Sequence, residues 1–283
     1  MSYYENDKIR FYVPTGIPLE EALKKTTHLC IAAHQDDLEI MASHVAAQCM
    51  LDDTSWFTGI VVTDGSGSPR QGRYANFSEE DMRTIRHKEQ CKAADIGEYA
   101  AVIFLDYPSK QLQSENYDLR HTLRELFSTL KPSIVYTHNI FDKHLTHLAV
   151  SLYTINMLRE LPINLKPEKV IGGEVWGALD WLADQHLVFE DASTFMNIQC
   201  SLIGVYDSQI SGGKDYLSGV LGRRRAHATF NEPHAVDKMS YLSIGQDMTA
   251  LIHENTDIVS YVERALGSVR ERIVNDLKSL KLG

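Results

Sequence analysis

Cysteine is scarce in this chain of 283 residues. The four cysteines are widely separated and form no C-x-x-C pair; they are Cys30, Cys49, Cys91 and Cys200. Such spacing suits neither a disulfide framework nor a metal site built on thiolates. We therefore interpret them as reduced thiols, most of them in the core.

Basic residues and long apolar runs are also in short supply. Lys and Arg total 28 against 38 Asp and Glu, which gives a formal net charge of −10. A surface with this balance repels phosphate backbones, so we expect no nucleic-acid partner. Residues 1–16 lack the basic flank and apolar stretch of a secretory signal. No later run approaches the roughly 18 apolar residues of a membrane helix, so we expect a cytoplasmic protein without a membrane span.

Repeats, low-complexity segments and linkers rich in Pro, Gly or Ser are absent too. The first half instead alternates short apolar runs with helical periodicity. Strands are predicted at 28–33, 56–63, 101–105 and 133–137, and helices at 38–51, 78–96, 117–130 and 144–161. Strands separated by helices pair in parallel through right-handed crossovers. The pattern predicts an α/β, Rossmann-like three-layer sandwich with a mostly parallel sheet.

The pattern changes after Pro162, where a C-terminal elaboration begins. Short strands are predicted at 169–176 and 187–189, and helices at 192–206 and 257–280. The stretch from 207 to 246, which contains three consecutive arginines (Arg223, Arg224 and Arg225), is predicted to be irregular and to cover a site formed by the first half. We expect a single domain over 1–283, with the core and its metal site in 1–161 and the pocket-shaping elaboration in 162–283.

Polar side chains follow the first predicted strand, at His34, Asp36 and Asp37. In open parallel sheets, ligands bind at this carboxyl edge. Two adjacent carboxylates repel each other unless a cation neutralises them, so a divalent metal is one explanation. The alternative is that an aspartate serves as an ordinary helix N-cap.

A second polar cluster follows the fourth predicted strand, at the same edge of the sheet. It contains His138, Asp142, His144 and His147. Two imidazoles and one carboxylate leave a fourth tetrahedral position for water, which is typical of a catalytic zinc site. The two clusters together predict a hydrolytic metal site holding one divalent ion.

These residues resemble the signatures of the PIG-L/LmbE-like zinc-dependent N-acetylglucosaminyl deacetylases. The segment His34-Gln35-Asp36-Asp37 is similar to the family's Ala-His-Pro-Asp-Asp signature, with Gln35 in place of proline, and the second cluster is similar to its His-x-x-x-Asp-x-His-x-x-His stretch. The resemblance implies His34, Asp37 and His147 as zinc ligands and Asp36 as general base. It also implies that His144 stabilises the oxyanion or protonates the departing amine.

Supporting similarity lies in the loop after the second strand and in the following helix. Asp64 and Gly65 match the family's Thr-Asp-Gly loop, and Arg86 matches its Arg-x-x-Glu helix. The resemblance implies that all three bind substrate, with Arg86 contacting hydroxyls or a phosphate. The alternatives are a plain loop, and an Arg86–Glu89 pair on the helix surface.

We therefore expect a zinc-dependent hydrolase that removes acetyl from an N-acetylglucosamine-type substrate, a small N-acetylated sugar conjugate. One rival is a metal-dependent phosphoesterase, or another hydrolase with the same three-ligand site. A second is a non-catalytic sugar- or nucleotide-binding protein, although no G-x-G-x-x-G turn follows the first strand. The oligomeric state stays open, a homo-oligomer included.

Overall fold

A computed structural model describes residues 2–5, 9–253 and 256–280. Its strands are β1 (Ser2–Glu5), β2 (Arg10–Val13), β3 (His28–Ala32), β4 (Phe57–Thr63), β5 (Ala101–Tyr107), β6 (Ile134–His138), β7 (Lys169–Gly173), β8 (Leu187–Asp191) and β9 (Leu242–Asp247). Within the described residues they form one nine-stranded sheet in the order β1-β2-β5-β4-β3-β6-β7-β9-β8. The five central strands are parallel, and antiparallel pairs close both edges. The predicted α/β fold with a mostly parallel sheet is confirmed.

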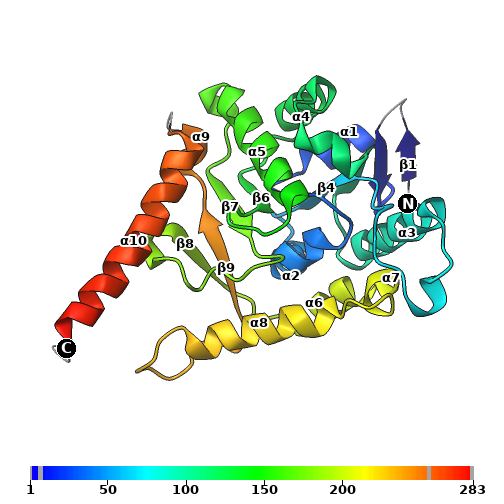
Figure 1. Cartoon of the computed structure of the whole chain (residues 1–283). Helices are drawn as coiled ribbons and strands as arrows, with labels where there is room; N and C mark the ends of the chain where they lie inside the picture. Colours follow the sequence, from blue (N-terminus) through cyan, green and yellow to red (C-terminus); the bar gives the residue numbers. More distant parts are fainter. Residues whose placement is uncertain (1, 6–8, 254–255, 281–283) are drawn as a thin grey trace.

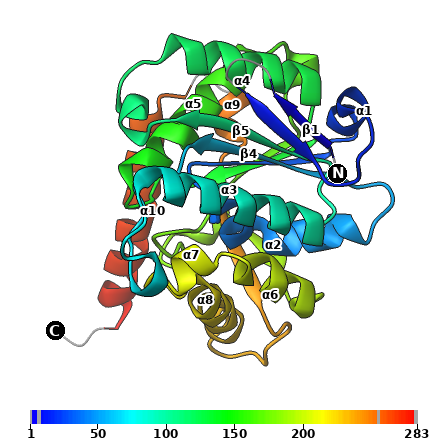
Figure 2. The same ribbon diagram turned by 90° about the vertical axis from the view of Figure 1, so that its right-hand side faces the viewer.

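Helices cover both faces of this sheet (Figure 1). They are α1 (Leu19–Lys24), α2 (Asp37–Met50), α3 (Glu79–Ile96), α4 (Tyr117–Leu130), α5 (Leu145–Glu160), α6 (Met196–Gly204), α7 (Asp207–Ile210), α8 (Tyr216–Phe230), α9 (Ala250–His253) and α10 (Ile258–Ser279). Short 3₁₀ turns lie at η1 (Gly72–Tyr74), η2 (Ser109–Gln113), η3 (Ile163–Leu165) and η4 (Asp184–His186). Helices α1, α4 and α5 pack on one face, and α2 and α3 on the other (Figure 2).

The C-terminal part adds a further layer outside α2 and α3. Helices α6, α7 and α8 lie there, and α6 packs against both α2 and α3 (Figure 2). Strands β7, β9 and β8 extend the same sheet beyond β6. No helix among the described residues is both long and apolar enough to span a bilayer. The predicted division at residue 161 stays a prediction.

Several sequence-predicted elements match the structure closely. Helix α3 begins after Ser78, whose side chain accepts a hydrogen bond from the Asp81 N–H while Asp81 accepts one from the Ser78 N–H. It ends at Gly97, as predicted. The central strands are runs of mostly buried residues, which suits strands covered on both faces.

Two stretches differ from the prediction. Residues 207–246 are not irregular, because they form α7, α8 and β9. The three arginines lie within α8, where Arg224 is buried and Arg225 is exposed. Strands β1 and β2, which pair antiparallel with each other and through β2 with β5, were not predicted either, nor were the short helices α1 and α9.

The direction of chain progression reverses at β3. From β3 the chain moves through β4 to β5 on one side, and later through β6 to β7 on the other. At such a switch point the loops after neighbouring strands separate and leave a crevice at the carboxyl edge. The loops after β3 and β6 both reach this crevice.

Candidate metal centre and active site

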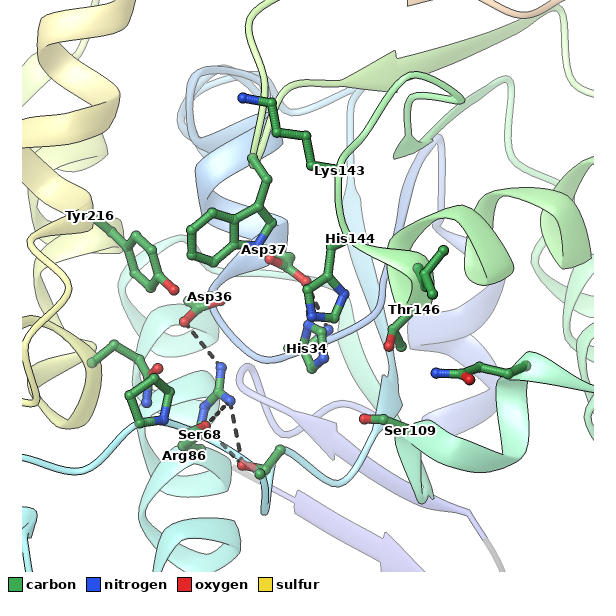
Figure 3. A pocket seen from close by; sticks show the side chains of 17 residues that line it. His34, Asp36, Asp37, Ser68, Arg86, Ser109, Lys143, His144, Thr146 and Tyr216 are labelled. Atoms are coloured by element: carbon green, nitrogen blue, oxygen red, sulfur yellow. Dashed lines mark hydrogen bonds and ion pairs between the residues drawn. The ribbon is translucent and has the colours of Figure 1, made fainter.

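The turn between β3 and α2 places two carboxylates in different directions. Asp36 has φ of 85°, a left-handed conformation that non-glycine residues rarely adopt. Asp37 then begins α2, and its carboxylate also accepts the His34 N–H at 2.9 Å. Asp37 faces the histidines, whereas Asp36 faces Arg86 (Figure 3).

Three ligand atoms converge at this edge. His34 Nδ1 lies 3.1 Å from Asp37 Oδ2 and 3.2 Å from His147 Nε2, and His147 Nε2 lies 3.3 Å from Asp37 Oδ2. Ligands at about 2.0–2.1 Å from a tetrahedral zinc ion are about 3.3 Å apart. The donor set and its spacing therefore fit a zinc-type ion held by His34, Asp37 and His147.

The other two histidines of the cluster have different surroundings. His138 Nε2 accepts the Ala33 N–H at 2.8 Å, so this lone pair is already used, and the ring stacks on His147 at 3.9 Å between centroids. His144 is the N-cap residue of α5 and lines the cavity, with its ring 5.3 Å from that of His34. It can therefore touch a substrate, whereas His138 supports the site from beneath.

Asp142 contacts His147, His144 and Trp176 and so fixes their positions. Its Oδ2 lies 3.3 Å from His147 Nδ1 and accepts the Trp176 N–H at 3.2 Å. Its Oδ1 accepts the His144 N–H at 2.8 Å. A carboxylate on the second nitrogen of a ligating histidine fixes the ring and raises its basicity.

Asp36 is held by Arg86. The Arg86 guanidinium lies 3.0 Å from Asp36 Oδ2, and it also donates to the Gln35 carbonyl and to Ser68 Oγ. The predicted alternative of an Arg86–Glu89 pair is wrong, because Glu89 accepts hydrogen bonds from Ser208 instead. Arg86 lines the cavity but is buried, with most of its donors bound to protein oxygens.

The two carboxylates differ in acidity. Burial raises the pKa of Asp36 well above its ordinary value, although Arg86 opposes this. Burial acts on Asp37 as well, but the imidazoles of His147, His34 and His138 hold its pKa below the ordinary value. Burial also lowers the pKa of His34 and His144, which keeps these rings neutral. Asp37 thus stays ionised, and Asp36 is the better proton acceptor.

The predicted substrate-binding loop lies only partly at the cavity. Gly65 lines it, with φ of 69°. Asp64 is not among the lining residues, and its carboxylate is bound to Arg83 at 2.9 Å and to the Ser66 N–H. The structure therefore brings together all the predicted site residues except Asp64.

The cavity has a volume of about 470 Å³, and several of its lining residues were not singled out from the sequence. The C-terminal part contributes Trp176, Gln209 and Tyr216 to its wall. Trp176 is held between Lys214, 5.0 Å above its ring, and Tyr216, whose ring lies edge-on at 6.3 Å. No local pattern marks these residues, because Trp176 follows β7, Gln209 lies in α7 and Tyr216 begins α8, so they meet at the cavity only through tertiary packing.

A buried network behind Asp36 was also missed. The Asp36 N–H donates to Gln90, whose amide donates to Glu39 at 2.9 Å. Glu39 also accepts hydrogen bonds from Tyr99 and Tyr206, and burial raises its pKa to about 7. Glu39 lies in a helix among apolar residues, so the sequence could only have shown it as an unexplained buried charge.

Comparison with known proteins confirms the resemblance. Residues 29–158 match the PIG-L family, described as GlcNAc-PI de-N-acetylase. No curated protein sequence matches the chain.

Solved structures with the same fold have several activities. N,N'-diacetylchitobiose deacetylase from Pyrococcus horikoshii is 18% identical with a TM-score of 0.63, covering 87% of this chain and 92% of that one. A 4-carboxy-2-hydroxymuconate hydratase from Pseudomonas putida is 16% identical with a TM-score of 0.62, covering 79% and 96%. The zinc-inhibited form of a teicoplanin deacetylase is 17% identical with a TM-score of 0.56, covering 78% and 97%. At these identities the likeness shows the fold.

Proposed function

Since residues 29–158 form a PIG-L family region, we propose that this chain is a zinc-dependent hydrolase that removes acetyl from an N-acetylated, sugar-type substrate. The observation that carries the proposal is the cluster of His34, Asp37 and His147 ligand atoms 3.1–3.3 Å apart beside a buried Asp36. An N,N'-diacetylchitobiose deacetylase and a teicoplanin deacetylase, the latter solved in a zinc-inhibited form, have the same fold, which supports the deacetylase part of the proposal.

The metal, when bound, polarises the amide carbonyl and acidifies a water molecule. Asp36 accepts a proton from the attacking water, which its raised pKa favours. His144, neutral and facing the cavity, donates a hydrogen bond to the oxygen on which charge develops. The proton that the departing amine needs comes from Asp36 or His144. Arg86 holds Asp36 in place throughout.

The walls of the cavity suit a sugar. Trp176 and Tyr216 offer aromatic surface. Ser68 lies on the same side as Arg86 (Figure 3), and the Gly65 carbonyl accepts a hydrogen bond from Arg86. We propose that residues 1–161 supply the metal centre and that 162–283 shape the substrate pocket. The partner is then a small N-acetylated sugar conjugate.

The rival phosphoesterase function has less support. The Arg86 guanidinium is already bound to Asp36, the Gln35 carbonyl and Ser68, so a phosphate in the cavity would have to rely on Lys143 instead. Hydration of an unsaturated acid is a further rival, because a hydratase has the same fold.

The test is a product analysis on zinc-loaded protein with a panel of N-acetylglucosamine conjugates, phosphate esters and unsaturated acids. We expect acetate and free amine in equal amounts from at least one conjugate. Phosphate release, or hydration without acetate release, would instead assign one of the rivals.

A further inference from the structure

A second cavity lies beside the metal-site cavity and is larger, with a volume of about 810 Å³. Leu145 and Gln113 line both cavities, so the two adjoin each other. We call this second cavity the acyl groove. Apolar side chains dominate its lining; they are Leu112, Leu145, Leu148, Ala149, Leu152 and Met157. On the basis of the function proposed above, we propose that the acyl groove holds the hydrocarbon chain of an N-acyl group longer than acetyl.

The residues around the metal site indicate on which side the sugar lies and on which side the acyl chain lies. Arg86, Ser68 and Tyr216 lie on one side of His34, while Thr146 and Ser109 lie on the other (Figure 3). Hydroxyl groups lie on both sides, but among these residues the aromatic ring is that of Tyr216, so a sugar that stacks on an aromatic ring belongs on the Arg86 side. The acyl carbon chain extends from the opposite side of the amide carbonyl and therefore points past Leu145.

The groove follows one face of α5. Leu145, Leu148, Ala149 and Leu152 are spaced at three, four and seven residues, so they share that face. From Leu145 to Leu152 the helix rises about 10 Å. An extended chain of about eight carbons, with C–C bonds of about 1.5 Å, covers this length.

Exposure and charge along the groove suit an uncharged apolar ligand. Leu145 is 65% exposed and Leu152 39% exposed, although both are large apolar residues. The charges at the rim are paired with one another, since Arg120 binds both Glu115 and Glu160 at 2.6 Å. Arg159, also at the rim, donates to the Leu251 carbonyl at 2.6 Å.

The reaction remains hydrolysis of an amide. Water adds to the carbonyl carbon, the C–N bond breaks, and a proton passes to nitrogen. The products are the sugar amine and a medium-chain carboxylic acid in place of acetate.

The experiment compares two substrate series on the zinc-loaded full chain. In the first, glucosamine carries N-acetyl, N-butanoyl, N-hexanoyl or N-octanoyl; in the second, N-acetylglucosamine carries alkyl aglycones of the same lengths. We expect kcat/KM in the first series to rise about threefold per methylene up to about eight carbons, because each buried methylene gains hydrophobic free energy. The second series should show no comparable rise.

Variants of the groove test its location. Ala149→Phe fills the groove and should lower the octanoyl-to-acetyl ratio of kcat/KM at least tenfold, while Ala149→Ser, which keeps the volume, should lower it much less. Leu152→Gln, at a half-exposed position that tolerates polarity, should lower the ratio about threefold. Circular dichroism confirms that each variant is folded.

The outcomes separate the two proposals. A flat or falling first series with N-acetyl cleavage intact overturns the acyl groove but not the deacetylase function. A rise confined to the second series also overturns it, because the groove then holds the aglycone. Failure of every amide substrate overturns the deacetylase function, and the acyl groove with it.

Discussion

At the residue scale, the proposed mechanism gives two neighbouring aspartates different roles. The carboxylate of Asp37 lies near three imidazoles, whereas that of Asp36 pairs with the Arg86 guanidinium and lines the cavity. The left-handed backbone at Asp36 turns the two side chains apart. Strain of this kind persists at functional sites because the surrounding contacts hold it.

Replacing Asp36 tests this division of labour. Asp36→Ala should keep the metal, since no ligand is removed, yet lower kcat by about 10²–10⁴-fold through loss of the proton acceptor. Elemental analysis and acetate release measured on the same sample check both parts. His147→Ala is the comparison and should release the metal. A variant at Asp36 with full turnover would contradict its assignment as base.

Gly65 offers a second test beside the cavity. A Cβ there would lie 2.1 Å from Gln35 Oε1 and 3.3 Å from Arg86 Cδ, and φ is +69°. Gly65→Ala should therefore cost about 1–2 kcal/mol of unfolding free energy and lower activity, because the left-handed backbone disfavours a side chain and Arg86 must shift. Gly67→Ala is the matched control, since nothing lies within 4 Å of its added Cβ. Equal effects in urea unfolding would show that the close packing at Gly65 does not matter.

At the element scale, the first half of the chain was predictable because its signals are local. Helix α4 has the predicted bounds, and α3 begins at its capping box. Helix α8 was missed because two of the residues on its buried face are polar: Arg224 bonds to Ser43 and Gln199, and His227 lies 3.0 Å from Glu174. Apolar periodicity cannot reveal a helix that is buried through hydrogen bonds.

The capping box of α3 can be measured directly. Ser78→Ala removes the acceptor for the Asp81 N–H and should lower the unfolding free energy by about 1 kcal/mol. Ser78→Asp, which retains an acceptor, should lose much less. If chemical denaturation gave the same midpoint for Ser78→Ala and Ser78→Asp, the side-chain cap would not contribute to stability.

His87 links α3 to the sheet and should give a pH-dependent stability. Burial lowers its pKa to about 4, and its ring lies 4.0 Å from that of Phe104. Between the unfolded value of about 6.5 and the folded value, the unfolded chain binds the proton and the folded chain does not. Stability from this group is therefore full above about pH 6.5 and is lost as pH falls towards 4, by about 3 kcal/mol.

This pH dependence is checked by measuring the unfolding free energy of His87→Gln and of the unsubstituted chain between pH 4 and 7. The variant should lose less stability than the unsubstituted chain as pH falls. Parallel curves for the two proteins would show that another group carries the dependence.

At the scale of the whole molecule, the site joins parts that are distant in sequence. The proposed ligands come from the loop after β3 and from the first turns of α2 and α5, and the Trp176 N–H is bound by Asp142. The two His/Asp clusters could be predicted because the carboxyl ends of parallel strands share one edge. The wall formed by Trp176 and Tyr216 could not, because it depends on how the loop after β7 and the start of α8 pack together.

Removal of the metal is the most direct measurement of the central claim. Chelator-treated protein should release no acetate from an N-acetylated sugar substrate, and one equivalent of zinc should restore it. The thermal midpoint should rise with zinc as well, since an ion that binds only the folded chain stabilises it by about 2.7 kcal/mol at one hundred times its Kd. Acetate release that persists without metal, or a chain that binds no zinc, would contradict the account.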